Sequence, residues 1–330
     1  MAPATSTGET FSERFARQTQ HGDSIFRGVT LVFALAVIGL VATIGFVVIN
    51  GSALAREQFG LGFLFDSIWN PTATDTSPAV FGAWPAIRGT LLSSAIALLL
   101  AAPIAVGIGI YLAELCPVSL RTPLSFLVEL LAAIPSVIYG TWGVLVFVPF
   151  FVTYIATPLA DTIGQAIPWL AGPVSTGRGI MAAGCVLAIM ILPTIAAITR
   201  DVLSLVPNTQ REVLLALGAT RWEVIAKSVV PYARAGIIGG IMLGLGRALG
   251  ETMAATMLIG NSQQINQSLF EPGTTAASLV ANELPNVQSP IHESALITVA
   301  MVLFLITLVL NLGARLIIWN MNRGPANARR

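Results

Sequence analysis

Six long apolar runs constrain this chain more than any other feature of its sequence. A helix needs about 20 apolar residues to cross the hydrocarbon core of a bilayer, and each run reaches that length. Lipid tolerates only helices and closed barrels as spanning structures, and no ten-residue alternating pattern indicates a barrel. We therefore predict an all-α polytopic membrane protein with six transmembrane helices. The predicted spans are residues 28–50, 88–113, 123–150, 179–200, 233–260 and 294–316.

The composition agrees with this fold class. The 330 residues are 55% hydrophobic and 10% charged, whereas soluble domains are about 25% charged. A net charge of +1 indicates no nucleic-acid partner. Cys116 and Cys185 lie in or beside apolar segments, so we expect packed cysteines and no disulfide framework. His21 and His292 show no metal-ligand spacing, and we predict neither a metal site nor a cofactor.

The distribution of basic residues predicts the orientation. With the N-terminus placed in the cytoplasm, thirteen basic residues fall on the cytoplasmic side and three on the opposite side. Cytoplasmic loops carry an excess of Lys and Arg, so both termini are expected to be cytoplasmic. The first apolar run follows about 28 polar residues and is too long for a signal-peptide core. It is predicted to be a retained transmembrane helix.

The spans and loops divide the chain into four predicted segments. We expect both tails to be disordered, over residues 1–22 and 323–330. The long outer loop, 51–87, is partly apolar and is expected to pack on the membrane surface or on a partner. The predicted segments are a cytoplasmic tail (1–27), the first span with its outer loop (28–87), a core of five spans (88–318) and a C-terminal cytoplasmic tail (319–330).

The cytoplasmic loop 200–234 has the strongest local structure signals of any loop. Thr209 followed by Glu212 is a capping-box pattern, which predicts a short helix over about 210–217. Gly218 then stands where a left-handed glycine commonly ends a helix.

A second capping-box pattern, Thr220 with Glu223, opens another short helix before Pro231. The loop is therefore predicted to be a helix, a tight glycine turn and a second helix. Its apolar residues fit two interpretations equally well: a helix on lipid headgroups, or a plug in a partner's groove.

The fifth span carries two charges on a face of small residues. Gly236, Gly240 and Gly244 recur every fourth residue, a pattern that lets another helix approach closely. Helical periodicity places Arg247 and Glu251 on that same face. Both charges are therefore expected to face protein or an internal cavity.

Arg247 has two interpretations. An arginine at the centre of a span costs at least about 2.5–3.5 kcal/mol. One possibility is an ion pair with Glu251 that fixes helix register, although buried pairs rarely add stability. The other is an anion contact in a transport pathway, because a guanidinium presents a planar fork of donors that suits phosphate or carboxylate.

Residues of the third span are weaker candidates. Glu129 is predicted to be a boundary residue with a polar contact. Pro135 and Ser136 are expected to kink the helix, with Ser136 bonding freed backbone groups or contacting substrate. Pro103 and Pro193 are expected to kink the second and fourth spans.

Several of these motifs resemble a known family. Glu212-Val213-Leu214, with Gly218 and Pro231, is similar to the EAA signature of ABC importer permeases, although Val213 and Leu214 replace its two alanines. The resemblance implies that loop 207–231 docks into a separate ATP-binding subunit. The chain itself has no GxxxxGK[ST] phosphate-binding loop and is not expected to be an enzyme.

Longer stretches are more specific. "RALGETMAATMLIGN" and "LLAAIPSVIYGTWG" resemble the phosphate-specific ABC permeases of the PstC type. This resemblance implies a type I ABC importer permease fold in a bacterial plasma membrane. It also implies four partners: a second homologous permease, an ATPase dimer, an extracytoplasmic phosphate-binding protein and inorganic phosphate. In that family an arginine and a glutamate at the positions of Arg247 and Glu251 are implicated in transport.

Two sets of candidate residues follow, and alternative functions stay open. A permease for another oxyanion would share the docking loop, and a secondary transporter would use Arg247 and Glu251 as a proton-coupled pair. An intramembrane hydrolase lacks a convincing catalytic set. The pathway candidates are Arg247, Glu251, Ser136 and Thr252. The docking candidates are Arg211, Glu212, Ala216, Leu217, Gly218 and Ala219.

Overall fold

The computed structural model describes residues 11–72, 79–174 and 176–322, most of which are helical. Within these residues six helices are long and apolar enough to cross a membrane, as the sequence predicts. They are Ile25–Gly51, Trp84–Leu115, Ser136–Asp161, Ile180–Ser204, Arg221–Leu249 and Pro290–Asn320.

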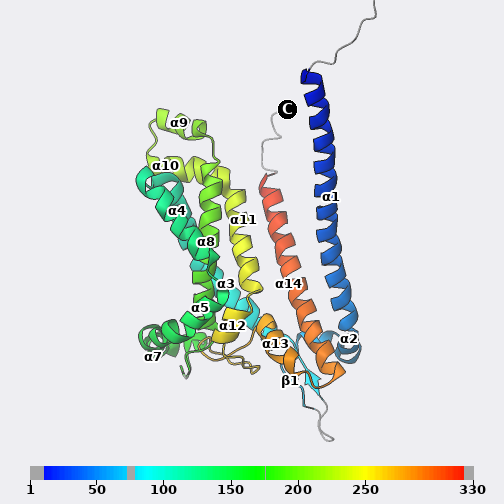
Figure 1. Ribbon diagram of the computed structural model, residues 1–330. Helices are drawn as coiled ribbons and strands as arrows, with labels where there is room; N and C mark the ends of the chain where they lie inside the picture. Colours follow the sequence, from blue (N-terminus) through cyan, green and yellow to red (C-terminus); the bar gives the residue numbers. More distant parts are fainter. Residues whose placement is uncertain (1–10, 73–78, 175, 323–330) are drawn as a thin grey trace, which may run out of the picture. The chain divides into compact units, whose positions relative to one another are not determined.

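Figure 1 labels the elements in chain order. Short π-helical turns continue several of the long helices, at Tyr111–Leu115, Gly143–Phe147, Val152–Ala156 and Ile225–Val229. The helices and strands are α1 (Phe11–Gly51), α2 (Ala53–Phe59), β1 (Trp69–Asn70), β2 (Val80–Phe81), α3 (Trp84–Ile110), α4 (Val118–Ala133), α5 (Ser136–Trp142), α6 (Val148–Phe151), α7 (Thr157–Asp161), α8 (Ile180–Ser204), α9 (Asn208–Ala216), α10 (Arg221–Val224), α11 (Val230–Leu249), α12 (Met253–Leu258), α13 (Ala276–Glu283) and α14 (Pro290–Asn322).

The chain forms two units, residues 1–51 and 52–330. The described part of the first unit is the single helix α1. Its helix begins at Phe11, so the expectation of a disordered tail is wrong for residues 11–22. No proline lies between Phe11 and the span, and nothing stops the helix from extending toward the N-terminus. The rest of that tail and residues 323–330 lie outside the described residues.

The second unit is built around α8, which packs between α3 and α11 and is the most buried of its spans. The glycines of α11 allow this close packing. A Cβ atom on Gly240 would lie 2.9 Å from Cγ2 of Ile198, and one on Gly244 would lie 2.6 Å from Cδ1 of Ile195. The prediction of a small-residue face that lets a neighbouring helix approach is confirmed.

The predicted span 123–150 is wrong as a single helix. α4 ends at Ala133, Ile134 is extended (ψ 129°), and α5 begins only at Ser136. Pro135 has no N–H to donate and disfavours helical geometry in the residue before it. It therefore breaks this helix completely, where the sequence predicted only a kink.

The predicted span 233–260 is also interrupted. α11 ends at Leu249, and α12 begins at Met253 after the three residues 250–252. Gly250 leaves the helical region (φ −92°, ψ 2°), in keeping with the low helix propensity of glycine. This break has a direct effect on the two charges of the span, because Glu251 no longer belongs to the helix that carries Arg247.

Part of the outer loop 51–87 packs on its own chain, while other described residues of the loop, such as Leu61 and Phe65, are exposed, so the expected membrane or partner contact stays a prediction. It contains α2 and a small antiparallel hairpin in which Trp69 pairs with Phe81. Both aromatic side chains are buried, with ring centroids 5.0 Å apart. They belong to a core cluster with residues of α13 and α14, including Leu279 and Leu296.

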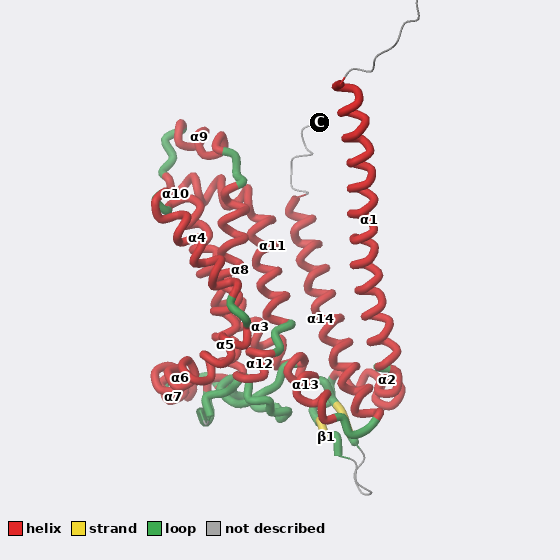
Figure 2. The backbone as a smooth tube through the Cα atoms, in the orientation of Figure 1, coloured by secondary structure: helices red, strands yellow, loops and turns green. Residues whose placement is uncertain are grey.

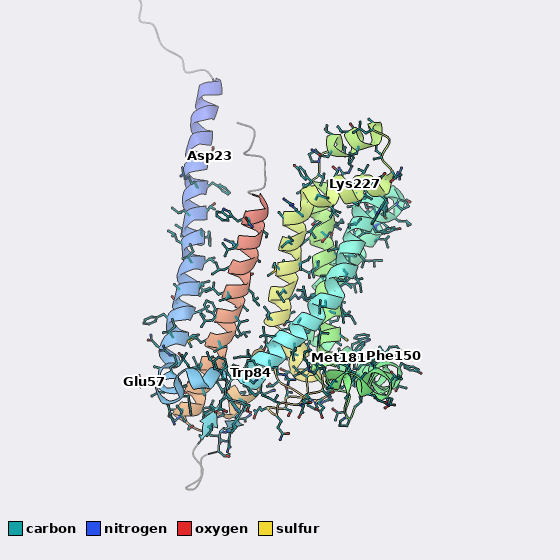
Figure 3. All side chains as sticks on the ribbon, turned by 180° about the vertical axis from the view of Figure 1, so that it is seen from behind. Asp23, Glu57, Trp84, Phe150, Met181 and Lys227 are labelled. Atoms are coloured by element: carbon teal, nitrogen blue, oxygen red, sulfur yellow. The ribbon has the colours of Figure 1, made fainter. Side chains whose placement is uncertain are left out.

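The two ends of the second unit are built from different elements. α9 and α10 lie at one end, together with the C-terminal end of α14, and α12, α13 and β1 lie toward the other (Figure 1). Most of the loop residues gather at the second end (Figure 2). In the rear view, Lys227 marks the first end, while Trp84 and Met181 lie toward the second (Figure 3).

Candidate functional site

Arg247 lies in the last turn of α11 and is half-buried. Its Nη1 atom donates to Thr194 Oγ1 of α8 at 3.2 Å and to the backbone carbonyl of Ala132 at 3.5 Å. The arginine therefore faces neighbouring helices, as predicted. Neither partner was foreseen, because one lies on another helix and the other is a carbonyl at the end of α4.

The break at Pro135 supplies that carbonyl. The last four carbonyls of a helix have no i+4 partner within the helix. For Leu131 the residue four positions on is Pro135, which has no N–H, and only a long bond of 3.4 Å from the N–H of Ile134 reaches this carbonyl from the backbone. Tyr139 Oη donates a hydrogen bond to the carbonyl of Leu131 at 2.8 Å, and Arg247 donates one to the carbonyl of Ala132. The prediction that the Ser136 side chain performs this task is wrong, since Ser136 makes no side-chain hydrogen bond in the described chain.

Two helix ends thus stabilise the positive charge of Arg247. The C-terminus of a helix carries a partial negative charge that favours cations. Arg247 lies in the last turn of its own helix, α11, and its guanidinium also contacts the C-terminal end of α4. Backbone dipoles can therefore offset part of the cost of burying this charge.

No carboxylate pairs with Arg247 in the described residues. Glu251 Oε1 instead accepts the backbone N–H of Ala254 at 3.2 Å, at the start of α12. The register-fixing ion pair considered from the sequence is absent between these two residues, because α11 ends before Glu251. The site keeps an arginine whose charge is not cancelled by a side chain.

Some N–H groups of the Arg247 guanidinium have no acceptor in the described residues. Among the described residues, no protein acceptor engages Nε or Nη2 of Arg247. A guanidinium with a free edge can bind two oxygens of a planar or tetrahedral anion. This part of the site can therefore bind an oxyanion without breaking the contacts that hold the arginine.

Ser136 and Thr252, the other pathway candidates, stand at the two chain breaks. Ser136 begins α5, and Thr252 directly precedes α12, and both are half-buried. α5 packs closely on α12, since a Cβ on Gly140 would lie 3.1 Å from the Cα of Ala254. The fold thus joins the two broken spans, although no contact links either hydroxyl to Arg247.

The cytoplasmic loop forms the predicted helix, turn and helix. Gly218 has φ 84°. Its N–H bonds to the carbonyl of Leu215, and the N–H of Ala219 bonds to that of Leu214, each at 3.0 Å. These two bonds form a Schellman motif, so the predicted role of Gly218 is confirmed.

The two predicted capping boxes have different outcomes. The Thr220–Glu223 box is present in both directions at the start of α10. The Thr209–Glu212 box is wrong, because α9 begins at Asn208, two residues before the predicted start, with Pro207 at the N-cap. Thr209 then lies inside the first turn, where its side chain cannot cap.

Arg211 belongs to the interior side of α9. Its side chain forms a two-point ion pair with Glu114, with Nη2–Oε1 at 2.6 Å and Nε–Oε2 at 3.2 Å. It also donates to the carbonyls of Leu203 and Val206. Arg211 therefore ties the loop to the ends of α3 and α8. No sequence pattern indicated Glu114 as its partner.

The opposite side of α9 is exposed. Leu217 is 78% exposed and Val213 is 54% exposed. Ala216, Gly218 and Glu212 are also exposed, and Glu212 has no side-chain partner in the described residues. Ala219 is half-buried. Five of the six docking candidates thus lie on or beside this surface, and Arg211 does not.

Glu129 makes the polar contact that the sequence predicted. Its Oε1 accepts from Nη2 of Arg200 at 2.9 Å, and Arg200 also pairs with Asp201 at 2.6 Å. The contact joins α4 to the end of α8. A carboxylate early in one apolar run and an arginine at the end of the next were the only sequence signals for it.

Comparisons with known proteins agree with this architecture. Residues 105–321 match the sequence profile of the family described as binding-protein-dependent transport system inner membrane component. The chain is 44% identical over 317 residues to the phosphate transport system permease protein PstC of Haemophilus influenzae, covering 95% of this chain and 98% of that protein. It is also 44% identical over 292 residues to the protein of the same name from Mesorhizobium japonicum, covering 87% of each.

Among solved structures, the chain resembles one of the MetNI methionine ABC transporter in an inward facing conformation. The TM-score is 0.54 at 18% identity, over 73% of this chain and 97% of that chain. This similarity shows a shared fold alone. The predicted fold is therefore one that a solved ABC transporter shares.

Proposed function

Because the chain belongs to the family of binding-protein-dependent transport system inner membrane components, we propose that it is a permease subunit of an ATP-driven importer of inorganic phosphate. The proposed substrate rests on two kinds of support. Relatives that are 44% identical over most of their length are named phosphate transport system permeases. The chain also holds a half-buried arginine with free donors.

The single observation that carries the proposal is the environment of Arg247. Its charge is supported by two helix ends, it lacks a carboxylate partner in the described chain, and Nε and Nη2 are unoccupied by protein. These properties suit the transient binding of an oxyanion. We assign Arg247 the anion contact, with Ser136 and Thr252 as hydroxyl donors and Glu251 as acceptor for a protonated phosphate oxygen.

The energy source in this proposal is a separate ATPase dimer that binds the exposed side of α9. The Schellman turn and the second capping box give this loop a fixed shape, and Leu217 and Val213 offer apolar side chains to a groove. The proposal also includes a second homologous permease and an extracytoplasmic phosphate-binding protein. α4 has no buried residue within this chain and offers a surface for the second permease.

The proposed location is a bacterial plasma membrane with both termini in the cytoplasm. The charge distribution supports this orientation. It assigns α9 and α10 to the cytoplasmic end of the second unit, and the loops around α12 and α13 to the extracytoplasmic end.

The test is uptake of labelled phosphate by proteoliposomes that contain this chain and the three proposed partner proteins. We expect uptake only when ATP is present on the side of the membrane that carries the ATPase, which corresponds to the cytoplasm. Arg247→Gln should lower the uptake rate at least about tenfold, since a hydrogen bond to a charged group contributes about 1.5–3 kcal/mol. Arg247→Lys should recover only part of it, because an ammonium lacks the planar fork.

Arg178→Gln is the matched control, since Arg178 is an exposed arginine with no side-chain partner in the described residues. It should leave uptake unchanged. Uptake without ATP that collapses with a proton ionophore would overturn the proposal in favour of a secondary transporter. Equal uptake of sulfate and phosphate would overturn the assigned substrate, and normal uptake by an assembled Arg247→Gln complex would remove Arg247 from the pathway.

A further inference from the structure

We propose that Thr194 is a further substrate-binding residue, whose hydroxyl donates a hydrogen bond to the oxyanion that Arg247 holds. The proposal deepens the proposed function and rests on it, because it adds a residue of α8 to the anion site of α11. Ser136 and Thr252, the hydroxyl residues predicted from the sequence, have no contact with Arg247. Thr194 is the hydroxyl residue that does contact Arg247 in the described chain.

The close packing of α11 on α8 fixes where Thr194 lies. A Cβ on Gly244 would lie 2.6 Å from Cδ1 of Ile195, so no space separates the two helices at this level. Arg247 follows Gly244 by three residues, about one helical turn, and Thr194 directly precedes Ile195. The packing therefore brings the guanidinium to the Thr194 hydroxyl, with Nη1 and Oγ1 3.2 Å apart.

The direction of this hydrogen bond leaves the proton of the hydroxyl free. A guanidinium has donors and no acceptor, so Oγ1 of Thr194 accepts from Arg247. A hydroxyl keeps one proton to donate while it accepts. In the described residues nothing accepts the proton of Thr194, and it is available to a ligand.

Other threonines of the long helices use this proton within their own helix. A hydroxyl bond to the carbonyl four residues earlier is common for threonine in a helix. In this chain the bond is made by Thr30, Thr43, Thr90, Thr141 and Thr298. Thr194 makes no such bond to the carbonyl of Met190. Its hydroxyl contacts the arginine instead, and its proton is not committed to the backbone.

The Thr194 and Arg247 side chains are both accessible to a ligand. Each residue is half-buried, whereas Thr199, further along α8, is completely buried. No carboxylate pairs with Arg247 in the described chain, and its Nη2 atom has no protein acceptor there. Nη1 and Nη2 are attached to the same carbon atom, so an anion that binds Nη2 comes close to the hydroxyl beside Nη1.

This arrangement of donors suits a tetrahedral oxyanion such as inorganic phosphate. One oxygen of the anion accepts from Nη2 of Arg247, and another accepts the proton of Thr194. The two donors come from different helices, α11 and α8, which pack tightly at this point. The anion therefore binds to a pair of donors whose separation is set by helix packing.

The experiment measures phosphate binding by the complete complex in lipid nanodiscs, without ATP and without the phosphate-binding protein. Cys116 and Cys185 are replaced by alanine. Ala132→Cys is the reporter, because the backbone of Ala132 contacts Arg247 and its side chain makes no polar contact. We measure the rate at which a small thiol reagent modifies this cysteine as the concentration of inorganic phosphate is raised. Phosphate should slow the modification.

Thr194→Val keeps the shape of the side chain and removes its hydroxyl. It should raise the phosphate concentration that gives half-maximal protection about tenfold or more, because the lost hydrogen bond is one to a charged group. Thr194→Ser keeps the hydroxyl and should protect nearly as well as wild type. Equal protection in Thr194→Val and wild type, or no protection in wild type, would overturn the proposal.

Thr199→Val is the matched control. It makes the same change on the same helix, at a buried hydroxyl that has no partner in the described residues. It should leave the protection unchanged. A loss as large as that of Thr194→Val would assign the effect to a general disturbance of α8 and would also overturn the proposal.

A double variant separates direct binding from support of Arg247. Thr194→Val is combined with Arg247→Gln, whose side chain is shorter and carries no guanidinium. If Thr194 contacts phosphate, the double variant should bind phosphate about threefold or more weakly than Arg247→Gln alone. Equal behaviour of the two, including an absence of protection in both, would show that Thr194 acts only by holding Arg247 and would overturn the proposal.

Uptake of labelled phosphate, measured on the same preparations in proteoliposomes, distinguishes this proposal from the proposed function. Failure of wild-type uptake together with Thr194-dependent protection would contradict the transport function but not the contact. Normal wild-type uptake with equal protection in wild type and Thr194→Val would contradict only the role of Thr194.

Discussion

At the scale of single residues, the adjacent charges Arg211 and Glu212 differ in their surroundings. Arg211 is 19% exposed and bonded at two points to Glu114, which is 10% exposed. Glu212 is exposed and has no side-chain partner in the described residues. We infer that the first holds the loop in place and the second is free to meet a partner.

We therefore expect Glu114→Gln to lower the free energy of unfolding by about 2–4 kcal/mol, because it leaves the Arg211 charge largely buried and unpaired. Thermal unfolding of the purified complex measures this loss. Glu212→Gln is the control and should change stability by no more than about 0.5 kcal/mol. Equal stability of Glu114→Gln and wild type would show that the ion pair does not hold the loop.

The sequence predicted single residues correctly where the prediction depended only on neighbouring positions in the chain. The position of Gly218 follows from the unique tolerance of glycine for positive φ, and the direction of Arg247 follows from helical periodicity. The partners of Arg247 could not be predicted. Thr194 comes from a different helix, and the carbonyl of Ala132 becomes available only because the chain breaks at Pro135.

At the scale of elements, the contact between α11 and α8 depends on individual glycines. A Cβ on Gly236 would lie 2.3 Å from Cγ1 of Val202, while a Cβ on Gly239 would have no neighbour within 4 Å. Valine is restricted at χ1 and cannot easily turn away. The two positions therefore form a matched pair on the same helix.

We expect Gly236→Ala to destabilise the protein by about 1–3 kcal/mol through overpacking. Gly239→Ala should be neutral or stabilise it by up to about 1 kcal/mol, since alanine is the better helix former. Thermal unfolding of both variants in the same detergent provides the comparison. An equal loss of stability in both variants would show that close packing of α11 on α8 is not the reason for glycine at these positions.

The six spans could be predicted because hydropathy is a local property of the sequence. Their interruptions could not, because a break within the membrane requires neighbours that bond the freed backbone groups. At Pro135 those neighbours are Tyr139 and Arg247. The capping box at Thr209 failed for a local reason: the residue pattern is present, but the helix begins two residues earlier, with Pro207 at the N-cap.

At the scale of the whole molecule, the second unit presents the exposed apolar side of α9 at one end and the polar loop 260–274 at the other. The proposed transport direction requires these ends to face opposite sides of the membrane. Leu217 is 78% exposed at the end of α9, and Ile265 is 39% exposed in the loop 260–274. Both therefore suit labelling from solution.

In a background without Cys116 and Cys185, we expect Ile265→Cys to react with an impermeant thiol reagent in intact spheroplasts. Leu217→Cys should react only in inside-out vesicles, because α9 is assigned to the cytoplasm, and the vesicles are prepared from cells without the ATPase, which would otherwise cover Leu217. Mass spectrometry of the labelled protein gives the readout. The reverse pattern would invert the orientation and with it the proposed direction of transport.

The support of Arg247 by two helix ends has a consequence for how such a site can be controlled. No carboxylate of the described chain pairs with Arg247, so the counter-charge there comes from peptide dipoles at the ends of α4 and α11. These dipoles are fixed in the backbone. A movement of the end of α4 relative to the end of α11 would therefore change the affinity of the site for an anion, which makes backbone geometry a variable that sets capture and release.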